Sequence, residues 1–348
     1  MADKGTDIFR YVDNFAKIAH VESIPVQKAV LESPLITIAI PTYKRADLLK
    51  EAIDSALKQD YDGTYEVLVV DNNPERGDET ELLLRSYAAY AHVSYYKNAE
   101  NVGMSGNWNR LYELAQGTWV VMLHDDDMLC ADYLRKMTAV LEDGCGLIAC
   151  KYRKLQDGVL GRPKHTSSSV SPVALIDFAW GNCIGAPVGV LMHRGKVLEQ
   201  GGFNDVYYPA ADYYCFAQMA KAYPAYMVNE QLSIYRMECN ASFRTEVLDG
   251  FMRANYAISN AIWRMCKIPS MVRKSIEVCR IKKQVKSLRR NWRRDYCCSE
   301  IPVTRNLFVY WFSYFVYKTL YLNLIRYRKY RQQRYYVVPE VVKREGGR

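Results

Sequence analysis

The chain has 348 residues, of which 49% are apolar and 24% are charged. This length supplies about two domains, and the composition is that of a folded globular protein, which excludes an intrinsically disordered chain. The net charge of +9 is uneven: residues 251–348 hold 23 Lys and Arg against 5 Asp and Glu, whereas residues 1–250 hold 24 against 33. The two regions are therefore expected to meet different partners.

Short apolar runs alternate with amphipathic stretches from residue 34 onward, after an extension, 1–33, that is predicted to be helical. The apolar runs predict strands at 35–40, 65–71, 93–97 and 119–123, and the intervening stretches predict helices at 46–59, 79–91 and 106–115. Such alternation is typical of parallel strands joined by crossover helices that cover both faces of a sheet. The predicted fold class is α/β, with a doubly wound, mostly parallel sheet.

The second part of the chain, about 145–245, is less regular. It predicts strands at 146–152 and 188–193, an exposed loop at 157–172 that is rich in Gly, Ser and Pro, and a helix beginning near Asp212. Beyond residue 247 the sequence is basic and rich in Tyr and Trp, with helical patterning and no strand signal. We therefore expect an extension of the sheet, followed by a basic, aromatic-rich helical region over 246–348.

Location and redox state are predicted from two absences. The first residues, MADKGTDIFRYVDNF, lack the basic start and apolar core of a secretory signal, which predicts a cytoplasmic protein. The ten cysteines contain one close pair, Cys297 and Cys298, and adjacent cysteines fit neither a zinc knuckle nor a disulfide framework. Reduced thiols are therefore expected.

Polar residues follow each predicted parallel strand at its carboxyl end, where ligands bind in sheets of this kind. These segments are Pro41 to Tyr43, Asp71 to Asn73, Asn98 to Gly103 and His124 to Asp127. Adjacent carboxylates repel each other, so the three aspartates of the last segment predict a divalent cation, Mg²⁺ or Mn²⁺, shared with substrate phosphates. The alternative is a solvated acidic turn in which Asp127 or Asp132 caps the next helix.

The turn after the first strand, PTYKRADLL, contains no glycine. Dinucleotide-binding and P-loop folds need glycines at this turn so that the backbone can approach phosphate, and neither fold is predicted. Phosphate must then be neutralised by a metal or by side chains. Asp71, after the second strand, can accept a hydrogen bond from a base or ribose, or it can initiate a turn, and the two roles are compatible.

Four segments, in this order and spacing, resemble the family-2 glycosyltransferases of the GT-A fold: IPTYKRADLLKEAIDSALKQ, EVLVVDNN, NVGMSGNWNRLYELAQGTWVVMLHDDDML and DYLRKM. The resemblance covers residues 34–245. It implies a nucleotide-sugar-binding half, 34–130, and a half for the acceptor and catalytic base, 131–245. It also implies inverting transfer of a sugar from a nucleotide-diphosphate donor, with Mn²⁺ or Mg²⁺ as cofactor.

The resemblance also implies a donor site. Thr42 and Asp71 match nucleoside contacts and Asp125 matches a ribose contact, while Asp126 and Asp127 match metal ligands. The implied donor-binding residues are Pro41, Thr42, Tyr43, Asp71, Asn72, Asn101, Gly103, Asn107, Asp125, Asp126 and Arg236, the last as a bidentate contact to the diphosphate.

Two residues depart from the family pattern. Asn72 stands where many relatives have a second acid, and because an amide can donate as well as accept, the base is left open. His124 stands where relatives often have an acidic or small residue. It is interpreted as a hydrogen-bond partner of the carboxylates, with direct metal ligation as the alternative.

The catalytic base implied by the resemblance lies at the start of a helix in the second half. In GGFNDVYYPAADYYCFAQMAKA the residue at that place is Asp212, a single acid where a pair is usual. It would accept the proton of the attacking acceptor hydroxyl. An ordinary helix N-cap is the alternative for Asp212, and Asp205 is the competing base. The candidate acceptor-binding residues are Trp180, Asn182 and His193, of which the aromatic residue fits a sugar-stacking or a core position.

The predicted function is that of an inverting, metal-dependent glycosyltransferase building a cell-surface polysaccharide on a glycan or polyprenyl-linked acceptor. A sugar nucleotidyltransferase is the enzymatic alternative, but it needs the glycine-rich turn that this chain lacks. A nucleic-acid-binding protein that uses the basic tail is the non-enzymatic alternative, and it is disfavoured because the tail's aromatics cluster in one apolar run. No nucleic-acid partner is expected, and a homo-oligomer stays open.

The tail predicts attachment to the inner face of the cell membrane. Residues 273–294 hold 10 Lys and Arg against one Glu, and they precede the aromatic run 307–325, which Lys318 and Asn323 interrupt. Basic clusters favour anionic lipid, and aromatic rings favour the interface, so a helix lying in the membrane surface is predicted. The alternatives are a helical subdomain packed on the catalytic domain or on a second subunit, and a membrane-spanning helix.

Overall fold

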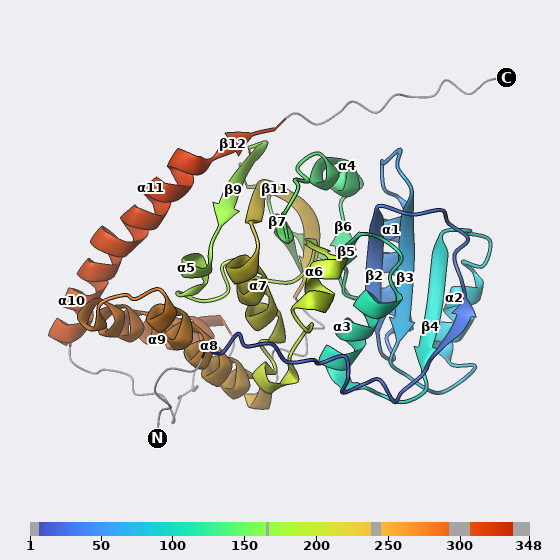
Figure 1. Ribbon diagram of the computed structural model, residues 1–348, viewed down its shortest axis with the longest axis horizontal. Coiled ribbons are helices and arrows are strands. Elements are labelled where there is room, and N and C mark those ends of the chain that lie inside the picture. The colour runs from blue at the N-terminus through green and yellow to red at the C-terminus, as the bar shows by residue number, and fades with distance from the viewer. Residues whose placement is uncertain (1–6, 165–166, 238–244, 292–306, 337–348) are drawn as a thin grey trace.

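A single mixed sheet runs through the computed structural model, which describes residues 7–164, 167–237, 245–291 and 307–336 (Figure 1). Its strands are β1 (Ser23–Gln27), β2 (Ile36–Thr42), β3 (Tyr65–Asp71), β4 (Val93–Asn98), β5 (Trp119–Met122), β6 (Met128–Leu129), β7 (Leu147–Gln156), β8 (Val159–Leu160), β9 (Ser169–Val173), β10 (Val190–His193), β11 (Ala225–Arg236) and β12 (Arg334–Tyr335). The strand order is β1-β4-β3-β2-β5-β10-β7-β11-β9-β12, with β6 and β8 paired at the side.

The helices cover both faces of this sheet. They are α1 (Ala46–Leu57), α2 (Glu79–Arg85), α3 (Gly103–Leu114), α4 (Tyr133–Thr138), α5 (Leu175–Phe178), α6 (Arg194–Glu199), α7 (Ala211–Ala222), α8 (Thr245–Met265), α9 (Ser270–Asn291), α10 (Leu307–Phe315) and α11 (Asn323–Gln332). A π-helical turn, Val316–Leu322, joins the last two helices. None of the helices in the described residues is long and apolar enough to cross a membrane.

The first half confirms the predicted α/β pattern. Strands β2 to β5 are parallel to one another, and β2 is buried along its whole length. Ile36, Ile38 and Ile40 point toward α1 and α4, whereas Ala39 and Leu68 belong to the core on the opposite face, with α3 and α7. Fully burying each of the Ile and Leu side chains contributes about 1.5–3 kcal/mol. An apolar strand covered on both sides thus carries the polar residues at its end into the interior.

The helical extension predicted for residues 1–33 is wrong in the described part, 7–33, which forms turns and the strand β1. The β-branched residues Ile24 and Val26 favour an extended chain, and Pro25 sits at a bulge where β1 pairs with β4. The buried Arg110 guanidinium donates to the carbonyls of Ile18 and Val21 at 2.9 and 2.7 Å. These bonds hold the segment against α3 without a helix.

The exposed loop predicted at 157–172 is wrong at its end. Residues 169–173 form β9, which pairs with β11 on one side and with β12 on the other. Ser169 is fully buried, and the Asn229 side chain donates to the hydroxyls of Ser169 and Ser171 at 3.0 and 2.9 Å. Polar composition suggested a loop because hydrogen bonds that satisfy buried serines cannot be read from sequence. Strand β12 likewise lies in the region where no strand was predicted.

The C-terminal region is helical as predicted, over α8 to α11, within the described residues. Residues 292–306 and 337–348, together with 238–244, lie outside the part of the chain that the structure describes. In Figure 1, α10 and α11 follow one another along one end of the molecule, and β4 and α2 lie at the opposite end.

Candidate active site

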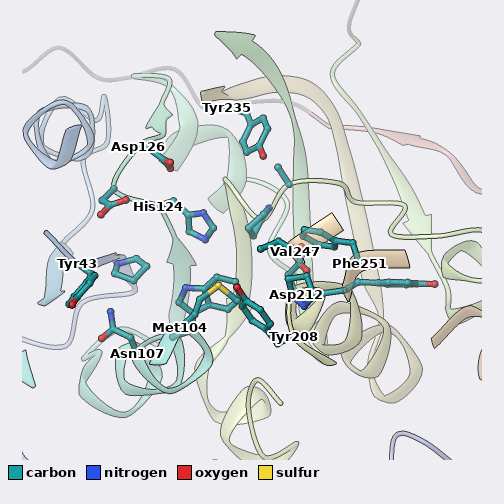
Figure 2. A pocket seen from close by; sticks show the side chains of 18 of the residues that line it. Tyr43, Met104, Asn107, His124, Asp126, Tyr208, Asp212, Tyr235, Val247 and Phe251 are labelled. Carbon is teal, nitrogen blue, oxygen red and sulfur yellow. The ribbon is translucent and has the colours of Figure 1, made fainter. Parts of the chain in front are cut away.

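A cavity of about 640 Å³ lies at the carboxyl ends of β2, β3 and β5, where the sequence predicted a crevice. Polar side chains from several elements line it, as Figure 2 shows for a labelled subset. Of the predicted site residues, those that line the cavity are Pro41, Thr42, Tyr43, Asn72, Asn101, Asn107, Asp125, Asp126, Asn182 and Asp212. The remaining predicted residues, which do not line it, are Asp71, Gly103, Asp127, Trp180, His193 and Arg236.

The acidic turn after β5 is buried and held by hydrogen bonds. Thr42 Oγ1 donates to Asp125 Oδ2 at 2.9 Å, and Arg45 Nη1 donates to Asp126 Oδ2 at 2.9 Å. Burial, reinforced by the neighbouring Asp126 charge, raises the pKa of Asp125 to about 6. The pKa of Asp127 is also raised, by burial and then by Asp126. The turn is therefore not the solvated acidic turn of the alternative interpretation.

His124, Asp126 and Asp127 present a donor set that fits a divalent cation. One ligand atom from each lies within 4.8 Å of the others. Asp127 Oδ2 and His124 Nε2 are buried without a hydrogen-bond partner, which is costly unless another group satisfies them. Mg²⁺ and Mn²⁺ prefer oxygen ligands, and two of the three residues supply carboxylate oxygens.

The His124 ring stacks on Trp108, with ring centroids 5.4 Å apart. Burial lowers the pKa of His124, which keeps the ring neutral and able to offer a lone pair. Its Nε2 makes no hydrogen bond to the carboxylates, so the arrangement supports the metal-ligand alternative over the hydrogen-bond interpretation.

Asp212 lies in the first turn of α7 and faces the cavity on a different side from Asp126 (Figure 2). Its Oδ2 accepts a hydrogen bond from Asn182 Nδ2 at 3.2 Å. The N-cap of α7 is Ala210, so Asp212 is not the helix cap of the alternative interpretation. Burial raises the pKa of Asp212 to about 6, while hydrogen bonds from backbone N–H groups at the helix start oppose that rise. A carboxylate with such a pKa is suited to accept a proton near neutral pH.

Asp71 is not available to a ligand in this structure. It is fully buried, and its Oδ2 accepts from Lys97 Nζ at 2.8 Å and from Tyr95 OH at 3.2 Å. Lys97 is buried too and also pairs with Asp78, at 2.9 Å. The predicted nucleoside contact at Asp71 is thus replaced by a buried ion pair. Asn73, whose backbone N–H donates to Asp71 Oδ1, agrees with the turn role that was considered compatible.

Asn72 takes part in an amide network that shapes the nearby wall. Its Nδ2 donates to Asn101 Oδ1 at 2.8 Å, and its Oδ1 accepts from Asn98 Nδ2 at 3.1 Å. Asn98 also donates to Asn107 Oδ1, at 3.0 Å. Gly103, which was predicted to contact the donor, begins α3 with a φ of +74° and lines a neighbouring cavity instead. Its role here is to let the backbone turn into the helix.

Arg236 lies behind the acidic turn. Its backbone N–H donates to Asp127 Oδ1 at 2.9 Å, its Nε donates to the Asp126 carbonyl, and its guanidinium pairs with Glu51. The predicted diphosphate contact is therefore not preformed, and Arg236 fixes the turn in place.

Two predicted acceptor residues lie elsewhere. His193 ends β10 at the end of the strands away from the cavity, because β10 is antiparallel to β5 and pairs His193 with Trp119, the first residue of β5. There His193 Nδ1 accepts from Lys196 N and caps α6. The ring of Trp180 stacks on Tyr317, with centroids 3.8 Å apart, which corresponds to the core-filling alternative.

The segment that contains the acidic turn matches a known enzyme family. The model of the family described as "Glycosyl transferase family 2" matches residues 37–200, which contain β2 to β5 and the acidic turn. Residues 37–200 thus form a domain similar to those of glycosyl transferase family 2. The predicted enzyme class is thereby confirmed.

This glycosyltransferase is similar to a putative teichuronic acid biosynthesis glycosyltransferase, TuaG, of Bacillus subtilis. The two are 27% identical over 252 residues, which cover 70% of this chain and 89% of TuaG.

Two solved structures share its fold. S. aureus TarS 1-349 in complex with UDP-GlcNAc has a TM-score of 0.55 at 14% identity, with 75% of this chain and 74% of TarS covered. The mannosyltransferase PcManGT from Pyrobaculum calidifontis, in complex with GDP-Man and Mn²⁺, has a TM-score of 0.50 at 17% identity, with 77% and 79% covered. The likeness to these structures confirms the GT-A fold.

Several residues of the glycosyltransferase site were missed in the sequence. Arg45 lies in PTYKRADLL, after the first predicted parallel strand, and the three aspartates follow another strand of the same sheet. A cation and three carboxylates at the same end of the sheet were a usable signal for an ion pair. Tyr208 and Tyr235 line the cavity without any local pattern that marks them. Val247 and Phe251, from α8, also line it, so the C-terminal region contributes to the site rather than only following the catalytic domain.

Proposed function

We propose that this glycosyltransferase is an inverting, metal-dependent enzyme that moves a sugar from a nucleotide-diphosphate donor to a glycan or lipid-linked acceptor. The observation that carries the proposal is the placement of the acidic turn, with its unpaired buried ligand atoms, and of Asp212 on one cavity. The acidic turn would hold a cation that neutralises the diphosphate, and Asp212 would accept a proton.

The donor side is assigned to the ends of β2, β3 and β5. Thr42, Tyr43, Asn101 and Asn107 line the part of the cavity proposed for the nucleoside, and Asp125 is proposed to contact the ribose. His124, Asp126 and Asp127 would hold Mn²⁺ or Mg²⁺, with which the complex of PcManGT with Mn²⁺ agrees. When bound, such an ion supplies Lewis-acid stabilisation to the leaving diphosphate. Arg45 orients Asp126 through their ion pair.

The acceptor side is assigned to α7 and its surroundings. Asp212 accepts the proton of the acceptor hydroxyl as that oxygen forms its bond to the anomeric carbon and the bond to the diphosphate breaks. Asn182 positions the carboxylate through its hydrogen bond to Oδ2. Attack on the face opposite the leaving group inverts the anomeric configuration.

A role in surface polysaccharide synthesis, at the inner face of the cell membrane, is part of the proposal. It is supported by the likeness to TuaG, whose name assigns it to teichuronic acid biosynthesis. The UDP-GlcNAc complex of TarS and the GDP-Man complex of PcManGT support a nucleotide sugar as donor without selecting the base.

The test is a panel of UDP-, GDP- and dTDP-sugars incubated with the full chain, with and without Mn²⁺, and assayed for slow donor hydrolysis. One donor should be hydrolysed in a metal-dependent way. Calorimetry with the matching nucleoside diphosphate should show Mn²⁺-dependent affinity that Asp126→Ala abolishes. Asp132→Ala is the matched control, since Asp132 lies outside the cavity and pairs with Lys136. Affinity for the nucleotide that is unchanged in Asp126→Ala and independent of metal would refute the proposed metal site.

A further inference from the structure

The outer side of the C-terminal helices carries a cluster of exposed apolar side chains, which we call the aromatic face. It consists of Phe308, Val309, Trp311, Phe312, Phe315, Leu324, Tyr327 and Tyr330, all on α10 or α11. Phe308, Trp311 and Phe315 are 79%, 62% and 63% exposed. Clusters of this kind usually mark an interaction surface, because leaving them in water is unfavourable.

The opposite side of the same helical segment is packed on the protein. Val316 and Tyr317 are buried, and the Tyr317 ring stacks on Trp180. Tyr310 and Tyr314 pack against the core, and Lys282 of α9 lies over the Tyr310 ring at 4.0 Å. The segment therefore already has its place on the fold, and the aromatic face is what remains outside after that packing.

This packing connects the helical segment to the catalytic cavity. Trp180, which stacks on Tyr317, is two residues before Asn182, and Asn182 donates to Asp212 at 3.2 Å. The aromatic face thus has a fixed relation to the acceptor side of the site.

The aromatic face lies partly on a basic helix, α11, and a second basic helix, α9, packs against α10. The sequence of α9 contains eight Lys and Arg and one Glu, and that of α11 contains four Lys and Arg and no acid. Lys318 and Arg326 are exposed within the segment itself. A surface that combines aromatic rings with cations matches the apolar boundary and the negative headgroups of an anionic bilayer.

We propose that the aromatic face is a membrane-docking surface that lies flat in the headgroup region of an anionic bilayer, with Trp311 and Phe315 inserted. This surface stands on its own observations. Its use, to bring Asp212 to a lipid-linked acceptor, rests on the proposed function.

Charge argues against the other occupants of this surface. A symmetric contact between two copies would bring two basic α11 helices together without an acid on either, and like charges oppose such pairing. A nucleic acid would satisfy the charge but would leave most of the apolar side chains unburied, because phosphate contacts dominate that kind of binding.

The experiment is flotation of the full chain with vesicles of phosphatidylcholine alone or with 30% phosphatidylglycerol. Trp311→Ser/Phe315→Ser is the test variant. Tyr11→Ser/Val159→Ser is the matched control, because these two side chains are exposed to similar degrees, 63% and 69%, away from the aromatic face. Circular dichroism melts and donor binding of both variants check the fold separately from the membrane.

We expect the wild type and the control to float with anionic vesicles, and the test variant to lose at least tenfold in partitioning while it melts and binds donor as the wild type does. Equal flotation of the two variants would overturn the proposal, as would equal binding to neutral and anionic vesicles. A dimer in light scattering that the test variant converts to a monomer, with no flotation by either, would assign the face to a second copy. Retention on an RNA or DNA oligonucleotide, with no flotation, would likewise overturn it. Each readout is independent of whether the donor panel identifies a substrate.

Discussion

Replacing Asp212 by Asn separates a catalytic base from a structural residue, because the two roles predict opposite changes in stability. The amide keeps the shape of the carboxylate but cannot accept a proton at neutral pH. If Asp212 is the base, sugar transfer should fall by about 10²-fold or more, as expected for loss of general-base catalysis. Affinity for the donor nucleotide should stay unchanged, since the proposed function places Asp212 on the acceptor side of the cavity.

The stability change can be worked out from the pKa of Asp212, which burial raises from 3.8 to about 6. Between these pH values the folded protein holds a proton that the unfolded chain has released, so the free energy of unfolding falls as the pH rises through this window. At 1.36 kcal/mol per pKa unit, the ionised carboxylate costs the folded state up to about 3 kcal/mol above pH 6. Asp212→Asn should therefore be more stable than the wild type at pH 8, and the gain should shrink as the pH approaches 4.

Urea unfolding at pH 8 and pH 5, together with turnover at pH 8, measures both quantities. Asp205→Asn is the control, because Asp205 is exposed, pairs with Lys17 and lies outside the cavity. It should leave turnover unchanged. Near-normal turnover in Asp212→Asn would refute the assignment of the base, and a loss of stability at pH 8 would refute the reasoning from burial.

Three further predictions concern pH and the core. The kcat/KM of the wild type should decline as the pH falls below about 6, where Asp212 takes up its proton, and a pH profile of the same shape for Asp212→Asn would contradict this origin. Lys97→Met leaves the carboxylates of Asp71 and Asp78 without their buried partner, so urea unfolding should show a loss of about 3–5 kcal/mol, whereas an unchanged midpoint would mean that the pair is dispensable. Gly117→Ala should cost about 1–3 kcal/mol, because its Cβ would lie 2.5 Å from a backbone nitrogen of β2, and an unshifted melting temperature would show that the backbone yields there.

The parallel half of the fold, and most of the residues now proposed for the donor site, were predictable because both follow from local patterns. Strands such as β2 and β3 are mostly apolar, and the polar residues at and after their carboxyl ends mark the end of the sheet where the cavity lies. Thr42 and Asp125 were expected in one crevice because both follow strands of this sheet, and the structure joins them by a hydrogen bond that was not predicted.

What could not be predicted depends on partners that are distant in sequence. Asp71 looked like a ligand contact because nothing local shows that Lys97 is buried beside it. The prediction placed His193 at the site, because nothing local shows that β10 runs antiparallel to β5. That direction puts the last residue of β10 at the opposite end of the sheet from the cavity. The serine-rich sequence of β9 predicted a loop, because the hydrogen bonds that satisfy its serines come from a residue of β11 that is distant in sequence.

The two edges of the sheet are formed by the first and the last strands of the described chain, β1 and β12. During synthesis β1 meets its partner β4 early, whereas β9 must wait from Val173 until Arg334 has emerged. In that interval the backbone of β9 presents unpaired N–H and C=O groups on one side, which other nascent chains can extend as an intermolecular sheet. Ribosome-bound or truncated chains that stop before residue 334 should therefore aggregate more than complete ones, and sedimentation of both lengths after translation in vitro would measure the difference.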